Sequence, residues 1–130
     1  MTAEALPRIL VVEDDPLLSD LLAQKLSKHF DLVHAPTGEA ALAECGKHKP
    51  DLMILDILLP GIDGFEVLRR IKAEPATADV RVVVLSNLGS QEDIEKGTKL
   101  GAEKFIVKVS LSLEEVLTMV RTMLGQKTDA

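Results

Sequence analysis

The chain has 130 residues, 46% hydrophobic and 28% charged, which is enough for one globular domain with its own core. A net charge of −6 disfavours broad electrostatic binding to nucleic acid or anionic lipid, and a single cysteine, Cys45, excludes an internal disulfide and a cysteine-based zinc site. The apolar runs are too short to span a bilayer and residues 1–7 lack the basic start of a signal peptide, so we expect a cytoplasmic protein.

The first half of the chain alternates between short apolar runs and segments with helical spacing. Ile9–Val12 is a continuous apolar run that predicts a buried strand. Asp15 and Pro16 follow it as an N-cap residue and a first-turn proline, so we expect a helix with leucines along one face. A second strand is predicted at Leu32–His34, and Thr37 then opens a second helix.

The second half of the chain continues this alternation. Leu52–Leu55 and Val80–Leu85 are again almost continuously apolar, and a run at Lys104–Val107 predicts the fifth strand. A helix is expected after each of these strands. The predicted N-cap residues of these helices are Asp63, Ser90 and Ser112.

The predicted order is therefore a strand followed by a helix, repeated five times over residues 8 to about 125. Because strand–helix–strand crossovers are right-handed, this order predicts a doubly wound α/β fold, a three-layer sandwich with a parallel five-stranded sheet between two layers of helices. We expect residues 1–130 to form a single domain, with frayed ends at Met1–Leu6 and Gln126–Ala130. Ligands bind such sheets at the carboxyl ends of the strands, so functional residues are expected there.

Polar residues stand at the predicted carboxyl ends of four strands. In chain order they are Glu13, Asp14, Asp15, Asp56, Ser86, Asn87 and Lys108. Each has an ordinary explanation when it is taken alone: Asp15 before Pro16 is typical of a helix cap, and most acids and lysines at strand ends are solvated surface residues. Their convergence on one edge of one sheet is what favours a functional site.

These residue types suit phosphoryl transfer. Carboxylate oxygens from two strands can hold Mg²⁺, which bridges to phosphate oxygens. Asp56 can attack phosphorus as a carboxylate nucleophile and form an acyl phosphate. The ammonium of Lys108 can neutralise the transferring group, and the Ser86 hydroxyl can donate a hydrogen bond to one of its oxygens. The same lysine can hold the unphosphorylated carboxylates together, since bare acids in one pocket repel each other.

Five segments carry a family resemblance that covers residues 8–124. They are Ile9–Asp15, Asp51–Asp56, Leu59–Gly64, Val82–Asn87 and Gly101–Lys108. In this order they resemble the receiver domains of two-component response regulators, such as the chemotaxis regulators. The resemblance implies a flavodoxin-like sheet with strand order 2-1-3-4-5. It also implies a phosphorylation-activated signalling switch that catalyses only its own phosphorylation and slow dephosphorylation, and is not otherwise an enzyme.

The resemblance further implies a metal site. Asp14 and Asp56 correspond to direct Mg²⁺ ligands, and Mn²⁺ could substitute for Mg²⁺. Glu13 corresponds to a ligand that acts through water, and Leu58 to a residue that supplies its backbone carbonyl.

Other roles follow from the same resemblance. Asp56 corresponds to the phosphoacceptor and Lys108 to the lysine that assists it. Ser86 and Phe105 correspond to switch residues, a hydroxyl that moves toward the phosphoryl group and an aromatic ring that rotates inward.

Partners follow from the resemblance as well. The implied phosphodonor is a histidine kinase or a histidine phosphotransfer protein. The output surface would comprise the fourth helix, fifth strand and fifth helix, and would act on a downstream protein or a fused output domain. We expect no direct nucleic-acid binding by this domain and no membrane association, and receivers of this kind can form phosphorylation-dependent homodimers.

Three features depart from the usual family pattern or refine it. Val109 follows Lys108 where the family usually has proline, so we expect either a trans peptide or a strained cis peptide there. Asn87 stands where the family prefers Ala or Gly, and could crowd the phosphoryl group or donate a hydrogen bond to it. Leu58 and Leu88 border the path of the attacking water and cannot orient it, so we predict slow self-dephosphorylation.

Competing functions remain at this stage. A degenerate receiver would bind a partner without being phosphorylated. A hydrolase with an aspartyl nucleophile usually needs a second acid two residues later, where this chain has Leu58. A flavodoxin-like FMN-binding protein would need a phosphate loop rich in Ser, Thr and Gly after the first strand, and a nucleotide hydrolase would need a Walker-type loop. The three histidines, His29, His34 and His48, lack metal-like spacing and are expected on the surface.

Overall fold

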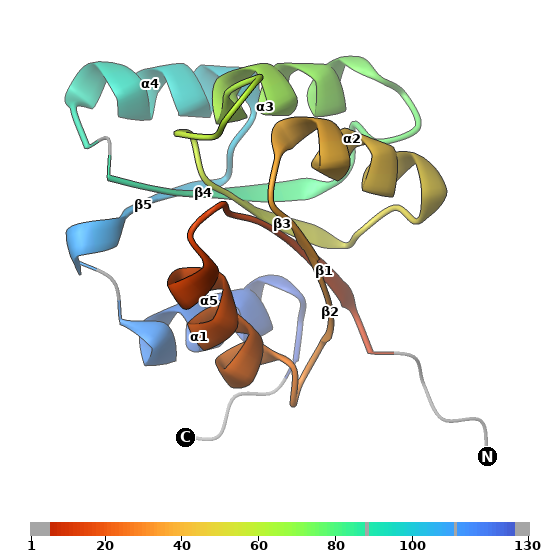
Figure 1. The fold of residues 1–130 in the computed structure, drawn as a ribbon, viewed down its shortest axis with the longest axis vertical. Coiled ribbons are helices and arrows are strands. Elements are labelled where there is room, and N and C mark those ends of the chain that lie inside the picture. Colours follow the sequence, from red (N-terminus) through yellow and green to blue (C-terminus); the bar gives the residue numbers. More distant parts are fainter. Residues whose placement is uncertain (1–5, 88, 111, 127–130) are drawn as a thin grey trace.

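The computed structural model describes residues 6–87, 89–110 and 112–126, in which strands and helices alternate strictly along the chain (Figure 1). The strands are β1 (Arg8–Val12), β2 (Asp31–Ala35), β3 (Leu52–Leu55), β4 (Arg81–Ser86) and β5 (Lys104–Val107). The helices are α1 (Pro16–Leu26), α2 (Gly38–Lys47), α3 (Gly64–Ala73), α4 (Gln91–Leu100) and α5 (Leu113–Met123), with a short 3-10 helix, η1 (Lys108–Ser110), between β5 and α5.

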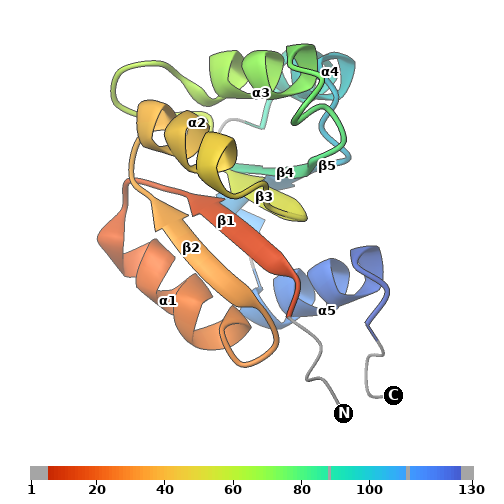
Figure 2. The same cartoon turned by 90° about the vertical axis from the view of Figure 1, so that its right-hand side faces the viewer.

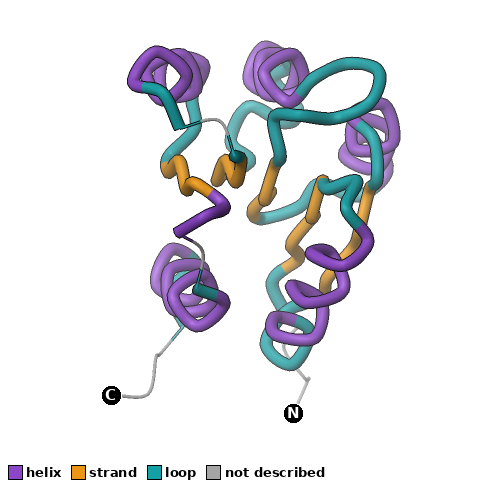
Figure 3. Tube along the Cα trace, turned by 60° about the vertical axis from the view of Figure 1, so that its left-hand side comes forward, coloured by secondary structure: helices purple, strands orange, loops and turns teal. Residues whose placement is uncertain are grey.

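All five strands form one parallel sheet in the order β2-β1-β3-β4-β5. Helices α1 and α5 pack side by side on one face of the sheet, and α2, α3 and α4 cover the other (Figures 1 and 2). The trace in Figure 3 shows the strands enclosed between the two helical layers. The predicted doubly wound fold and its strand order are therefore confirmed. Within the described part of the chain, no helix combines the length and apolar character that a membrane crossing requires.

The central strands are buried on both faces, which explains their continuous apolar sequence. Ile9 and Val11 of β1 belong to the core cluster beneath α1 and α5, whereas Leu10 and Val12 belong to the cluster beneath α2, α3 and α4. Burial of one such side chain contributes about 1.5–3 kcal/mol. Because these apolar side chains fill both faces of the sheet, polar side chains can be accommodated only at the ends of the central strands.

The start of each helix is set by a local cap. The side chains of five N-cap residues each accept a hydrogen bond from a backbone N–H of the first turn, as predicted for Asp15, Thr37, Asp63, Ser90 and Ser112. The cap of α1 is the one beside the acidic residues of β1: Asp15 Oδ1 accepts from Leu17 N at 3.0 Å. This aspartate therefore acts as a helix cap in the structure.

Some predicted boundaries are displaced. The fourth strand runs from Arg81 to Ser86 and not from residue 80 to 85, because the Val80 N–H bonds to the Thr77 carbonyl in the turn before the strand. Strand β2 extends one residue further at each end than predicted. Gln126, expected to fray, donates a hydrogen bond from its side chain to the His29 carbonyl at 3.2 Å. Leu6, also expected to fray, is 49% exposed and lies outside β1. The rest of the expectation about frayed ends, for residues 1–5 and 127–130, falls outside the described residues.

A close approach between the start of α3 and the two residues after β3 fixes the backbone at Asp56. Gly64, the first residue of α3, is buried and its N–H bonds to the Ile57 carbonyl at 2.8 Å. A Cβ on Gly64 would lie 2.2 Å from the Asp56 carbonyl oxygen and 2.7 Å from the Ile57 Cα. Both of these are backbone atoms that cannot move aside cheaply, so the position requires glycine.

Candidate functional site

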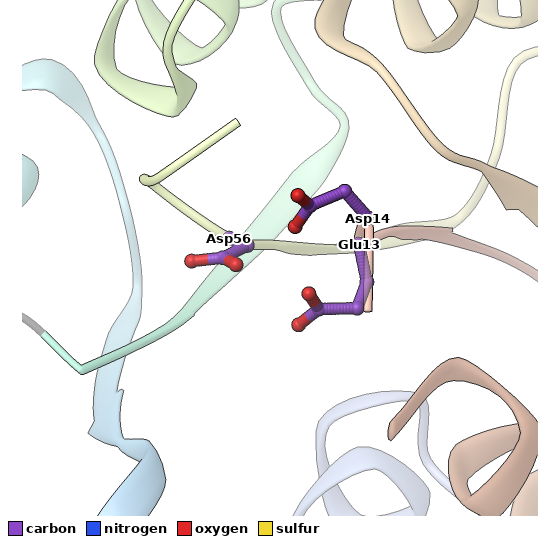
Figure 4. A group of neighbouring side chains, drawn as sticks. All are labelled: Glu13, Asp14 and Asp56. Atoms are coloured by element: carbon purple, nitrogen blue, oxygen red, sulfur yellow. The ribbon is translucent and has the colours of Figure 1, made fainter. Parts of the chain in front are cut away.

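Three carboxylates meet at the carboxyl edge of the sheet. Glu13 and Asp14 project from the end of β1 toward Asp56, which follows β3, the neighbouring strand (Figure 4). Each of the three offers an oxygen that lies within 4.8 Å of those of the others. Glu13 and Asp56 are buried, at 2% and 3% exposed, and Asp14 is exposed. The cluster is therefore open to solvent on the side of Asp14.

A single ammonium group balances the two buried acids. Lys108 Nζ lies 2.8 Å from Glu13 Oε1 and 2.9 Å from Asp56 Oδ2. Burial by itself would lower the pKa of Lys108, but its hydrogen bonds to Glu13 and Asp56 outweigh that effect and raise the pKa above its usual value. Lys108 therefore stays charged and joins the carboxyl ends of β1, β3 and β5.

The Glu13 carboxyl group is held by two further constraints. Burial raises its pKa, while the hydrogen bonds from Lys108 and from the Asp15 backbone N–H oppose that rise. The Asp15 N–H donates to Glu13 Oε2 at 3.1 Å. Glu13 is thus fixed at both oxygens, one by the lysine and one by the first turn toward α1.

The Asp56 carboxylate is also fixed at both oxygens. Lys108 bonds to Oδ2, and the Leu58 backbone N–H donates to Oδ1 at 3.2 Å. The Leu58 side chain is 55% exposed, so it stands at the mouth of the site. A carboxylate held in this way keeps one orientation, and each of its oxygens has a lone pair left to accept a further partner.

The remaining predicted residues lie along the same edge or next to it. Ser86 is the last residue of β4, fully buried and paired in register with Val107, the residue before Lys108. Asn87 follows it with an exposed side chain. Phe105 is half-buried on β5 and packs against α4, where its ring would lie 3.2 Å from a Cβ on Gly97. Leu88, the second leucine predicted to border the water path, lies outside the described residues.

The lysine reaches the site without the proline that usually follows it in the receiver domains that the sequence resembles. The Lys108–Val109 peptide bond is trans, and Lys108 opens the 3-10 helix η1. Val109 is 87% exposed. The trans alternative of the sequence prediction is therefore confirmed.

Hard carboxylate oxygens are the ligands that Mg²⁺ and similar divalent cations prefer. Two buried acids and one exposed acid on adjacent strands offer such oxygens on one side and access from solvent on the other. These residues fit a small divalent cation, with Glu13, Asp14 and Asp56 as the residues that could hold it.

Sequence reasoning missed one contact of this site. His34, near the end of β2, lies with its Nε2 atom 2.7 Å from the backbone carbonyl oxygen of Glu13. The surface position expected for this histidine is correct, since its residue is exposed. Only the pairing of β1 with β2 brings its ring to the acidic residues, so no local sequence signal could have indicated the contact.

Comparisons with known proteins show which family the chain resembles in sequence. A family model described as the response regulator receiver domain matches residues 9–121. The "DNA-binding dual master transcriptional regulator RpaA" of Synechocystis is 38% identical over 125 residues, which are 95% of this chain and 51% of that protein. The phosphate regulon transcriptional regulatory protein PhoB of Rhizobium meliloti is 35% identical over 92% of this chain and 52% of its own length. The chain thus spans about half the length of these two curated relatives.

A solved structure has a similar fold. The phosphorylated cyanobacterial phytochrome response regulator RcpA superposes with a TM-score of 0.78 and 30% identity. The match covers 92% of this chain and 91% of that one.

Proposed function

Because the chain belongs to the response-regulator receiver family, we propose that Asp56 is its phosphoacceptor in a Mg²⁺-assisted phosphorylation switch. One observation carries the proposal. Asp56 lies buried at the carboxyl end of the central strand, within 4.8 Å of two further acids and 2.9 Å from the ammonium of Lys108. This is the arrangement that an aspartyl nucleophile for an anionic phosphoryl group requires.

The transfer step follows from the orientation of Asp56. A carboxylate oxygen of Asp56 attacks the phosphorus, and a new P–O bond forms as the bond from phosphorus to the leaving group breaks. The leaving group departs with that electron pair, as acetate from a small acyl phosphate or as neutral imidazole from a phosphohistidine whose other ring nitrogen carries a proton. Leu58 N–H and Lys108 hold the attacking carboxylate in one orientation, which lowers the entropic cost of the step.

Charge neutralisation is the main requirement of this chemistry. Lys108 brings one positive charge to the Asp56 side of the pocket. A bound Mg²⁺ would supply two further positive charges, with Asp14 and Asp56 as direct ligands, Glu13 acting through water and the Leu58 carbonyl as a further oxygen; Mn²⁺ would serve in the same way. Ser86, at the end of the neighbouring strand, is the hydroxyl that would donate to a phosphoryl oxygen.

The proposed output begins at β4 and β5. Ser86 and Phe105 are the proposed switch residues: a movement of Ser86 toward the phosphoryl group would free space for the Phe105 ring to rotate, and α4 packs against that ring. Helix α4 buries only Gly97 among its own residues, so its attachment to the sheet is weak. A change at the α4, β5 and α5 surface would then reach a downstream protein or an output module. The proposed phosphodonor is a histidine kinase or a histidine phosphotransfer protein.

Intact-mass measurement tests the phosphoacceptor directly. Incubation with acetyl phosphate and Mg²⁺ should add the mass of one phosphoryl group to the wild type and to Asp20→Asn, a control at an exposed aspartate of α1. Asp56→Asn should gain nothing. A phosphorylated Asp56→Asn, or a wild type that gains no mass, would contradict the assignment.

We further propose that the acyl phosphate decays slowly. Leu58 stands exposed at the mouth of the site, two residues after the phosphoacceptor, and its side chain has no polar group to orient an attacking water. Replacing it by Asn should speed the loss of the phosphoryl mass after the donor is removed. An unchanged decay rate would show that this position does not control the water.

A further inference from the structure

The peptide that joins Glu13 to Asp14 lies where the chain leaves the sheet. Strand β1 ends at Val12, although the Glu13 N–H still bonds to the Ala35 carbonyl of β2 at 3.1 Å. The chain then turns toward α1. The Glu13 carbonyl oxygen lies just beyond this last hydrogen bond between β1 and β2. It contacts the His34 ring, whose Nε2 atom lies 2.7 Å away.

The chemistry of this contact fixes the roles of the two atoms. A carbonyl oxygen only accepts hydrogen bonds, so the His34 Nε2 atom carries the proton and donates it. At 2.7 Å the bond is at the short end of the normal N–H···O range. Because parallel pairing sets His34 opposite Val11, two residues before Glu13, the ring reaches forward along the strand direction to that carbonyl.

The two acids that follow β1 are held in different ways. The Glu13 carboxylate is buried and bound at both oxygens, by Lys108 and by the Asp15 N–H. The Asp14 carboxylate is exposed, so its direction depends on the backbone that carries it. That backbone begins with the Glu13–Asp14 peptide, whose oxygen is bound by His34.

We propose that His34 is a positioning residue for the cation site: by donating to the Glu13 carbonyl, it fixes the Glu13–Asp14 peptide and aims the Asp14 carboxylate at the cation. The inference rests on the proposed function, because it assumes that Asp14 binds Mg²⁺. Outer partners that orient metal ligands commonly change metal affinity by tenfold or more when they are removed. His34 acts through a backbone carbonyl of a neighbouring residue, so we expect a somewhat smaller effect.

Three substitutions at this position separate the hydrogen bond from the ring. In His34→Gln, the side-chain Nε2 lies the same number of bonds from Cα as the histidine Nε2, so it can donate to the same carbonyl. In His34→Asn, the donor lies where the histidine Nδ1 was, which is too close to the backbone to reach. His34→Ala removes the donor altogether. His48→Ala, at the exposed histidine that is the C-cap residue of α2, is the matched control.

The measurement is a titration with MgCl₂, followed by amide NMR shifts, together with the thermal unfolding temperature of each variant. We expect His34→Ala and His34→Asn to bind Mg²⁺ about five- to tenfold more weakly than the wild type. His34→Gln and His48→Ala should stay within about twofold. Recovery of affinity in the Gln variant is the result that a merely structural histidine would not give.

Other outcomes would overturn the inference. Wild-type affinity in His34→Ala or His34→Asn would show that the hydrogen bond does not position Asp14. Equal weakening in the Gln and Ala variants would assign the effect to the ring and not to its donor. If the wild type neither binds Mg²⁺ nor gains a phosphoryl group from acetyl phosphate, the proposed function fails first, and this inference fails with it. If the wild type binds Mg²⁺ and gains the phosphoryl group, and His34→Ala binds Mg²⁺ as tightly as the wild type, then only the role of His34 is refuted.

Discussion

Lys108 offers the sharpest test of the electrostatics of this site. Its ammonium lies 2.8 Å from Glu13 Oε1 and 2.9 Å from Asp56 Oδ2, and both carboxylates are almost completely buried. Lys108→Met keeps most of the side-chain volume and removes the charge. Two buried acids would then face each other without a counterion, and we expect the metal-free protein to be destabilised.

The size of the expected loss of stability follows from the burial of this ion pair. Removing one partner of a buried ion pair typically costs about 3–5 kcal/mol, because the other charge is left uncompensated. The Lys108 side chain is 17% exposed and the site opens to solvent beside Asp14, so the lower end of that range applies. A loss of about 3 kcal/mol would lower the urea midpoint by about 2 M for an m-value of about 1.5 kcal/mol/M.

Urea denaturation followed by far-UV circular dichroism measures this loss, since the chain has no Trp or Tyr for fluorescence. Lys104→Met is the control, because Lys104 is an exposed lysine of β5, the strand that leads to Lys108. Its free energy of unfolding should change by less than about 0.5 kcal/mol. A saturating concentration of Mg²⁺ should reduce the difference in free energy of unfolding between Lys108→Met and the wild type, because the cation returns positive charge to the carboxylates. A metal-free Lys108→Met as stable as Lys104→Met would refute the reasoning.

Four further predictions concern Gly64, Asp15 and Cys45. Gly64→Ala should cost about 3 kcal/mol in urea denaturation, because the added Cβ would lie 2.2 Å from the Asp56 carbonyl oxygen; an unchanged midpoint would show that α3 can shift without cost. Asp15→Ala should cost about 1 kcal/mol by the same assay through loss of the α1 cap, and a loss near zero would mean that the Leu17 N–H finds water instead. Burial raises the pKa of the Cys45 thiol to about 11, so at pH 8 iodoacetamide should alkylate the folded protein about 100-fold more slowly than the urea-unfolded chain, and equal rates would contradict its burial. Since the thiol binds its proton more tightly in the folded state, stability should also fall as the pH rises from about 9 toward 11.

The helix caps and the central strands could be predicted from the sequence because their causes are local. Asp15, Thr37 and Asp63 cap helices through hydrogen bonds to residues two or three positions away. The continuous apolar run of β3 is likewise explained by burial on both faces. The boundaries of β4 were less predictable, because the turn from Thr77 to Val80 competes with the strand for the Val80 N–H.

The sequence by itself determined the element order, the parallel sheet and the edge at which Glu13, Asp14, Asp56 and Lys108 meet. It could do so because right-handed crossovers bring every strand's carboxyl end to one edge, whatever the details of packing. The sequence also indicated that Lys108 could hold the acids together, but only the tertiary structure decided which atoms are connected. Lys108 joins two acids that lie 95 and 52 positions away, and His34 reaches Glu13 across 21 positions. Such contacts depend on strand pairing and on the space between neighbouring side chains, and no local pattern in the chain specifies either of them.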